Sequence, residues 1–262
     1  PHLAVSDLNV ASLHQHGVNL KDISFDVHSG EVLGIAGIAG NGQRELMEVL
    51  SGEVRTRNAD AILIGKEPVG LSGPIERRKA GMCFVPEERL GHGAVPELSL
   101  WENAFLSGAQ RMNLSNKGFM RVTASTVYAD NIVQAFNVKT VGVRNAANSL
   151  SGGNLQKFIF GREILQSPSV MVVLQPTWGV DAGSAAAIRQ SLIDLAEKGA
   201  AVLIISQDLE ELFEVSDRIA VICEGTLSEI HAASDITVDE IGLLMAGIKS
   251  QGSISEEVSN AH

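Results

Sequence analysis

The stretch that decides the fold is Leu150-Ser151-Gly152-Gly153-Asn154-Leu155-Gln156-Lys157. Ser-Gly-Gly at the start of a helix presents a hydroxyl and free backbone N–H groups to an anion. The helix is predicted to continue through 158–165, and the apolar, β-rich run 170–174 follows it. A plain helix cap with a flexible entry is the alternative for the motif alone, but its place before a buried strand makes it the most specific pattern in the chain.

A glycine-rich run, residues 34–45, lies closer to the N-terminus, between a predicted strand at 32–36 and a predicted helix at 44–50. Its spacing is that of a phosphate-binding loop, in which glycines let successive N–H groups turn toward phosphates beside a helix N-terminus. Gln43 stands where such a loop has its lysine, and Arg44 where it has a metal-holding hydroxyl. A tight turn that binds nothing remains the alternative on the glycines alone. The candidate nucleotide-binding residues are Gly37, Gly40, Asn41, Gly42, Gln43, Arg44 and Glu45.

Short apolar runs alternate with helical patterns over most of the chain, which predicts parallel βαβ units with ligands at the carboxyl ends of the strands. Besides 32–36 and 170–174, the predicted strands are 82–85, 201–206 and 218–223, and 185–198 has helical spacing. Two regions depart from this rhythm. Residues 3–30 are expected to form antiparallel strands, and residues about 98–166 a mostly helical insertion.

The composition limits the function classes. The chain has 262 residues, a formal net charge of −11 and two cysteines. An acidic surface disfavours nucleic-acid binding, and so few cysteines fit a reduced, cytosolic compartment. No run approaches the roughly 18 apolar residues of a membrane span, so any work at a membrane would need a partner. Residues 1–248 are expected to form one domain, and the Ser- and Glu-rich segment 249–262 a mobile tail.

The Ser-Gly-Gly motif resembles the signature of ABC-transporter ATPases. Other landmarks follow in that family's order: 84–89 is similar to the Q-loop region, 170–174 to the Walker B strand, 178–181 to the D-loop and 206–209 to the switch-histidine segment. The resemblance implies an α/β fold, with a P-loop NTPase core of ABC type, an N-terminal antiparallel β subdomain and an inserted helical subdomain.

The residues of these motifs are most similar to those of the second ATPase half of importers for simple sugars or nucleosides. Such importers carry two fused ATPase halves in one polypeptide. A start at Pro1 would then mark a cut between the halves. The resemblance implies as partners the first half or another nucleotide-binding domain, transmembrane permease subunits and, indirectly, a solute-binding protein, at the cytoplasmic face of the membrane as a peripheral protein. No nucleic-acid partner is expected.

Several positions depart from the family pattern. Glu87 stands at the Q-loop glutamine, Leu174 at the Mg²⁺-linked aspartate, Gln175 at the catalytic glutamate and Gln207 at the switch histidine. These replacements remove the metal ligand, the general base and the cations that phosphoryl transfer needs. The chain alone is therefore expected to be weak or inactive as an ATPase, with no intact catalytic residue and no metal site of its own.

The intact signature implies a different role. Family geometry pairs two halves head to tail, so Ser151, Gly152, Gly153 and Asn154 would act in trans on an ATP held by the partner half, with Asp181 in the D-loop. Mg²⁺ is then expected only at the partner's ATP site. Two alternatives stay open: a soluble ABC ATPase of translation or repair, and a non-hydrolytic nucleotide-binding regulatory domain.

Overall fold

The computed structural model describes residues 1–248, and the tail predicted to be mobile, 249–262, lies outside them. A central sheet runs through the molecule in the strand order β12-β11-β3-β10-β9-β6, and β13 also pairs with β11. Five strands are parallel, at the five ranges that the apolar runs predicted: β3 (Val32–Ala36), β6 (Met82–Val85), β9 (Val170–Leu174), β10 (Ala201–Ser206) and β11 (Arg218–Cys223). The short β12 (Thr226–Leu227) and β13 (His231–Ala232) pair with β11 in the antiparallel sense.

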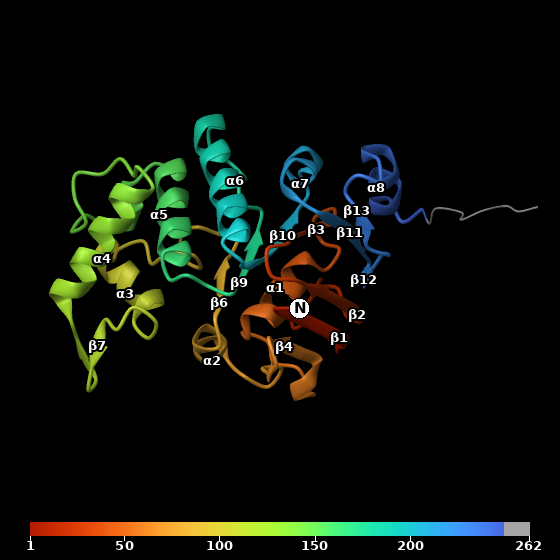
Figure 1. The fold of residues 1–262 in the computed structure, drawn as a ribbon, viewed down its shortest axis with the longest axis horizontal. Helices are drawn as coiled ribbons and strands as arrows, with labels where there is room; N and C mark the ends of the chain where they lie inside the picture. The colour runs from red at the N-terminus through yellow and green to blue at the C-terminus, as the bar shows by residue number, and fades with distance from the viewer. Residues whose placement is uncertain (249–262) are drawn as a thin grey trace, which may run out of the picture.

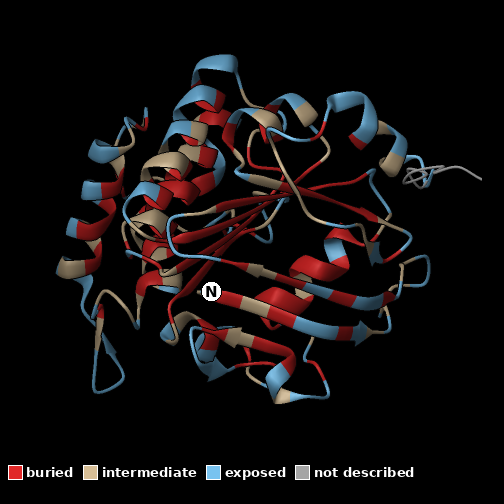
Figure 2. Ribbon diagram, turned by 45° about the vertical axis from the view of Figure 1, so that its right-hand side comes forward, coloured by how far each residue is buried: buried red, intermediate tan, exposed pale blue. Residues whose placement is uncertain are grey.

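The N-terminal part forms a second, antiparallel sheet, which confirms the expectation for 3–30. Its order is β2-β1-β4-β5, with β1 at Leu3–Val10, β2 at Leu20–Val27, β4 at Ile62–Ile64 and β5 at Glu67–Pro68. A short 3-10 helix, η1 (Ala59–Ala61), precedes β4. Helix α1 (Gln43–Ser51) packs with both sheets, because residues of α1, β1 and β9 share one buried hydrophobic cluster. Figure 2 shows red, buried segments where these elements meet.

The region predicted to be mostly helical contains α3 (Leu100–Gly108), α4 (Val122–Ala135), η2 (Ala147–Ser149) and α5 (Gly152–Ile164). Helices α3 and α4 lie at one end of the molecule (Figure 1). This region also contains a two-stranded hairpin that the sequence did not predict, formed by β7 (Ser115–Asn116) and β8 (Phe119–Met120). Its two-residue turn has Lys117 and Gly118 at positive φ, the geometry that favours tight hairpins.

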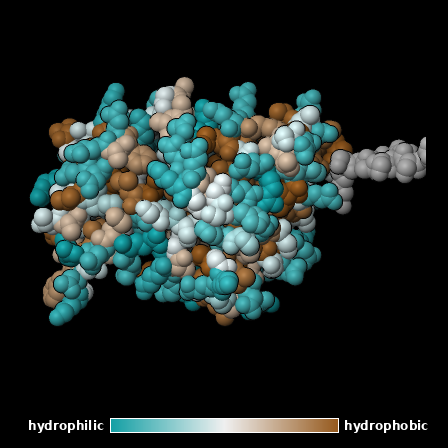
Figure 3. Space-filling model, in the orientation of Figure 1, coloured by the Kyte–Doolittle hydropathy of each residue, from teal (hydrophilic) through white to brown (hydrophobic). Residues whose placement is uncertain are grey.

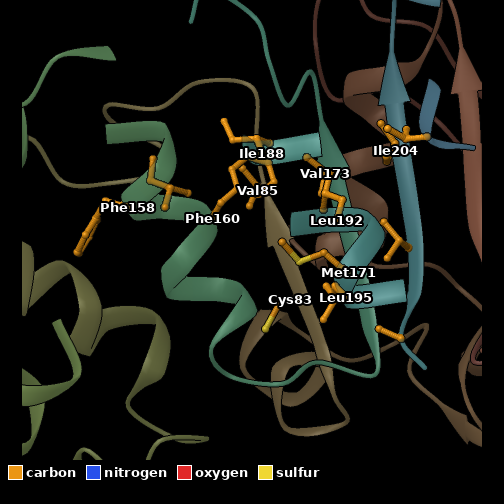
Figure 4. Close-up of a cluster of buried hydrophobic side chains, with 14 of the residues drawn as sticks. Cys83, Val85, Phe158, Phe160, Met171, Val173, Ile188, Leu192, Leu195 and Ile204 are labelled. Carbon is orange, nitrogen blue, oxygen red and sulfur yellow. The ribbon is translucent and has the colours of Figure 1, made fainter. Parts of the chain in front are cut away.

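The remaining helices are α2 (Pro74–Lys79), α6 (Ala182–Glu197), α7 (Leu209–Val215) and α8 (Val238–Met245). Alternate residues of each central strand face opposite sides of the sheet. Cys83, Met171 and Ile204 face the cluster that α5 and α6 complete. Figure 4 shows Val85 beside Phe160 of α5, and Met171 and Val173 beside Leu192 of α6. The opposite residues of the same strands join the α1 cluster. A core of aliphatic side chains on both faces holds the carboxyl ends of the strands in place.

The C-terminal end of α1 is fixed by one buried arginine. Arg77 of α2 is 0% exposed, and its guanidinium donates to the carbonyl oxygens of Val49, Leu50, Gly70 and Ser72. The last carbonyls of a helix lack partners within the helix and carry partial negative charge, so a buried cation there satisfies both needs. Burial lowers the pKa of Arg77 to about 10, and the nearby Arg55 adds to this effect.

Within residues 1–248, no helix is both long and apolar enough to span a bilayer. On the face in Figure 3, brown apolar side chains form separate small patches among teal polar ones.

Candidate nucleotide-binding site

The predicted phosphate loop connects β3 to α1 at the carboxyl edge of the central sheet. Gly40 has φ 86°, and Gly42, which caps α1, has φ 112°. Left-handed backbone of this kind is accessible mainly to glycine. Gly37 also needs a bare Cα, because a Cβ there would come within 2.9 Å of the Ile222 carbonyl oxygen. The structure therefore explains two of the glycines by backbone shape and the third by a close contact.

Gln43 does not reach out of the loop as a phosphate-binding lysine would. Its side chain is buried and folds back on the loop: Nε2 donates to the Ile38 carbonyl at 2.8 Å, and Oε1 accepts from the Asn41 N–H at 3.2 Å. The loop thus uses one of its own N–H donors internally. The sequence predicted the missing cation but gave no sign of this internal bond.

Asn41 ties the loop to the turn after β11. Its side-chain oxygen accepts from the Glu224 N–H at 3.0 Å, and its carbonyl oxygen accepts from the Gly225 N–H at 3.0 Å. Gly225 has φ 76°, and its own carbonyl accepts from Lys21 of β2 at 2.8 Å. One turn therefore holds the loop and the N-terminal sheet together.

We expect Gly225→Ala to lower the free energy of unfolding by about 1–3 kcal/mol. A Cβ at this position would lie 1.9 Å from the Asn19 carbonyl oxygen, in addition to the left-handed strain. Gly65→Ala is the matched control, because Gly65 has φ 59° with no atom within 4 Å of the added carbon. Urea unfolding of both variants separates the clash from the strain, and equal losses in the two would contradict this account.

The first turn of α1 carries an acidic residue, Glu45, at the end of the helix where an anion would bind. Glu45 is buried and accepts hydrogen bonds from the Val18 N–H at 3.0 Å and the Ser12 hydroxyl at 3.2 Å. Arg44 is not free to take the place of the lysine: its Nε pairs with Glu48 at 2.9 Å, and its side chain is 68% exposed. The helix N-terminus therefore contributes a carboxylate to the loop and no substitute for the lysine.

A cavity of about 450 Å³ opens beside the loop, and Glu87, Leu174 and Gln175 line it together with Gln43, Arg44 and Glu45. Leu174 places an apolar side chain where the family has a metal-linked carboxylate. Across residues 1–248, no group of three or more His, Cys, Asp or Glu side chains is placed to hold a metal ion. The lining combines the carboxylates of Glu45 and Glu87 with Arg44, two histidines (His14 and His16) and the apolar Leu174.

Gln175 directly follows β9 and has an unusual backbone conformation, with φ 52°. Its side chain turns toward the end of β10, where Oε1 accepts from the Ser206 hydroxyl at 3.3 Å and the Gln207 N–H at 3.4 Å. The structure thus brings together Gln175 and Gln207, the residues that the sequence comparison placed at the catalytic-glutamate and switch-histidine positions. Both carry neutral amides, which cannot take a proton from water.

The signature motif opens α5 with Ser151 as the N-cap residue, and the side chain of Ser151 makes no hydrogen bond to the helix backbone. Its hydroxyl accepts from the Asn154 side chain at 2.9 Å instead, and Asn154 also accepts from the Lys139 N–H at 2.8 Å. Ser151, Gly152 and Asn154 are not buried. The first-turn N–H groups of α5 are therefore left without a side-chain cap within the described chain.

The turn after β9 lies close to the signature glycines. A Cβ on Gly153 would lie 2.7 Å from Asp181, and one on Gly152 would lie 3.2 Å from Arg89. Arg89 donates to the Gly179 carbonyl at 3.3 Å. Asp181 caps α6 by accepting from the Ser184 N–H at 2.9 Å, and this backbone hydrogen bond lowers the pKa of Asp181. The sequence predicted Asp181 as a D-loop residue and assigned Arg89 no function.

The turn after β9 connects the two predicted sets of residues, those of the phosphate loop and those of the signature. Gln175 lines the cavity of the loop, while Gly179 and Asp181, a few residues further on, contact the signature. The signature helix also holds this turn directly, because Gln156 donates to the Pro176 carbonyl at 2.8 Å. This contact was missed, because a glutamine inside a helix gives no sequence signal of its partner.

A fold with an antiparallel N-terminal sheet, a P-loop-type core and an inserted helical region, with a signature helix beside the turn after β9, defines the class of ABC ATPase domains. The family profile described as ABC transporter matches residues 20–177, so the chain belongs to this family. Solved structures agree on the fold. An ATP-binding subunit of an ABC transporter has a TM-score of 0.74 at 19% identity, covering 94% of this chain and 100% of that chain. A nucleotide-free ATP-binding cassette has a TM-score of 0.70 at 21% identity, covering 92% and 98%.

The chain is also similar to curated import proteins. The nucleoside import ATP-binding protein NupA of Lactococcus lactis subsp. cremoris (strain MG1363) is 36% identical over 97% of this chain and 49% of the relative. The guanosine import ATP-binding protein NupO of Bacillus subtilis (strain 168) is 37% identical over 87% and 44%. The glucose import ATP-binding protein TsgD13 of Haloferax volcanii is 36% identical over 91% and 44%. The chain spans about half the length of the curated relatives it matches.

Proposed function

We propose that this chain is the second nucleotide-binding half of an ABC importer for nucleosides or simple sugars. The substrate class, nucleosides or simple sugars, is supported by relatives whose names give nucleoside, guanosine and glucose import. Their double length supports a first ATPase half as the partner. The chain would work as a peripheral protein at the cytoplasmic face of a membrane, through permease subunits that receive solute from a binding protein.

Within that assembly, the chain's own loop is a degenerate site. The observation that carries this is Gln43, whose buried amide is bonded to Ile38 and Asn41 inside the loop instead of being free for phosphate. Leu174 removes a metal ligand from the same cavity. ATP with Mg²⁺ would be held at the partner half's site, completed by Ser151, Gly152, Gly153 and Asn154 of this chain, with Asp181 beside them.

Binding of ATP by the chain alone tests the degenerate loop. We expect the wild-type chain to bind ATP no more tightly with Mg²⁺ than without it. The double variant Gln43→Lys, Leu174→Asp restores a cation and a metal ligand, and should gain at least about tenfold in affinity on adding Mg²⁺. The single variant Gln43→Lys is the control, because it lacks the ligand and should gain little from the metal.

Fluorescence titration with a labelled ATP analogue, with and without Mg²⁺, measures all three proteins. Micromolar, Mg²⁺-dependent binding or steady hydrolysis by the wild-type chain would contradict the proposal for the loop. It would leave the role of the signature open, since that role is tested separately.

A further inference from the structure

One buried carboxyl lies behind Gln175 and has no place in the proposed nucleotide chemistry. Glu211, in the first turn of α7, is 2% exposed. Its Oε2 is 3.0 Å from the hydroxyl oxygen of Ser206. Its Oε1 has no hydrogen-bond partner within residues 1–248, although the Thr177 hydroxyl lies near enough to lower the pKa of this carboxyl. A carboxylate left so poorly solvated in the interior would be costly.

The hydrogen bonds around Ser206 allow this cost to be avoided. The Ser206 oxygen has three partners: the Asp208 N–H donates to it at 3.1 Å, Gln175 Oε1 lies at 3.3 Å, and Glu211 Oε2 lies at 3.0 Å. A hydroxyl has one proton to donate and two lone pairs to accept with. Gln175 Oε1 can only accept, and a second donor, the Gln207 N–H, also points at it. If Ser206 donates to Gln175, the contact to Glu211 is a hydrogen bond only when Glu211 carries a proton.

We propose that Glu211 is protonated at neutral pH and acts as a positioning residue for Gln175 through Ser206. The relay runs from the Glu211 O–H to the Ser206 oxygen, and from the Ser206 O–H to Gln175 Oε1. It fixes the Gln175 amide with its oxygen toward β10, which leaves Nε2 as the donor available to the cavity. The inference concerns the chain itself and does not rest on nucleotide binding.

The charged groups around Glu211 agree with a neutral carboxyl. Burial has the largest effect and raises the pKa of Glu211, and the Asp208 carboxylate raises it further. The hydroxyls of Thr177 and Ser206 and the cation Arg189 of α6 lower it, without reversing the direction. Arg189 Nε lies 2.8 Å from Glu214 Oε2, an ion-pair distance without hydrogen-bond geometry. The two strands packed against α7, β3 and β10, contribute no charged residue.

The relay also supports the signature. Gln175 holds a left-handed backbone, which costs a non-glycine residue free energy unless its surroundings fix it. In the turn that follows, the Pro176 carbonyl accepts a hydrogen bond from Gln156 of α5, and the Gly179 carbonyl accepts one from Arg89. Fixing the Gln175 side chain therefore fixes the start of the turn on which the signature glycines rest.

Nuclear magnetic resonance of isotope-labelled glutamate carboxyl carbons tests the protonation in the wild-type chain. At about pH 7, where an ordinary glutamate is ionised, we expect one carboxyl signal of the protonated form, absent from Glu211→Gln. A spectrum in which every glutamate carboxyl is ionised at that pH would overturn the proposal. That overturning result is read from the wild-type chain alone and does not depend on whether a variant folds.

Thermal unfolding gives a second test with a defined sign. A folded pKa above the ordinary 4.5 means that the native state binds more protons than the unfolded state between those values, so wild-type stability falls as pH rises through that window. Glu211→Gln lacks this loss, and its amide can still donate to Ser206. Its Tm should rise relative to wild type by about 3–5 °C per pH unit in the window. A difference that stays flat with pH would contradict the proposal.

The fluorescence emission of Trp178 reports on the position of the turn. A carboxyl with only a structural role would not control that position. The chain has two tryptophans, so Trp101→Phe leaves Trp178 as the reporter. In that background, Glu211→Gln should keep the wild-type emission maximum, whereas Glu211→Leu and Ser206→Ala, which break the relay, should shift it. Unchanged emission in both broken variants would overturn the positioning role.

Discussion

ATPase activity and solute uptake are expected to fall by about 10²-fold or more when Ser151 is replaced by arginine in the full-length transporter. The expectation rests on the proposed role of the signature in trans. Ser151 is exposed, and no side chain caps the N-terminus of α5 after it, so hydroxyl and N–H groups face outward together. An arginine would remove the hydroxyl and fill the space in which the partner's ATP would sit. Initial rates of phosphate release and uptake of labelled solute measure the effect.

Ser149→Arg is the matched control for this prediction. Ser149 is exposed two positions earlier, and its hydroxyl bonds the Ala146 carbonyl in the same connection, at 2.6 Å. Adding an arginine there changes surface charge equally but leaves the helix N-terminus intact. We expect it to keep activity near wild type. Wild-type rates in Ser151→Arg, in a protein that folds and assembles, would refute the role of the signature.

The sequence predicted the backbone of this protein better than its interior polar contacts. The five parallel strands match their apolar runs residue for residue, because a strand buried on both faces leaves a continuous apolar signal. The hairpin at 115–120 left no such signal, since each of its strands has two residues.

The candidate site shows the same division. The spacing of the glycines gave the place of the loop and of the signature, because backbone geometry fixes where only glycine fits. Spacing cannot tell where a long polar side chain ends. Gln43 folds into its own loop, Arg89 reaches Gly179, and Arg77 is fully buried, although each type is usually solvent-exposed. Such contacts depend on segments far apart in the chain, which no local pattern encodes.

A buried ion network joins the helical region to the core. Glu163 of α5 is 0% exposed, and its two oxygens accept from Arg162 Nε at 2.8 Å and from Arg78 at 2.5 Å. Arg78 lies at the end of α2, just before β6, while Arg162 also donates to the Gly93 carbonyl at 2.8 Å. One carboxylate thus connects the signature helix, the second helix of the core and the loop that follows Glu87.

The charge state of Glu163 follows from this geometry. Burial acts to raise the pKa of its carboxyl, but the guanidinium groups of Arg78 and Arg162 more than offset it, so the pKa lies below its ordinary value of 4.5. Glu163 is therefore ionised in the folded protein. Its contribution to stability is fully present above pH 4.5 and is lost as pH falls through the lower folded pKa.

Glu163→Gln should lower the free energy of unfolding by about 3–5 kcal/mol, because it leaves two largely buried cations without a counter-charge. Urea unfolding near neutral pH measures the loss. Arg44→Ala is the control: it breaks an exposed ion pair with Glu48 and should cost less than about 0.5 kcal/mol. Because the wild type alone loses the ion network on acidification, the gap between wild type and Glu163→Gln should narrow below pH 4.5. A loss no larger than that of Arg44→Ala, or a gap that widens in acid, would show that the helical region is held to the core by apolar packing and not by this carboxylate.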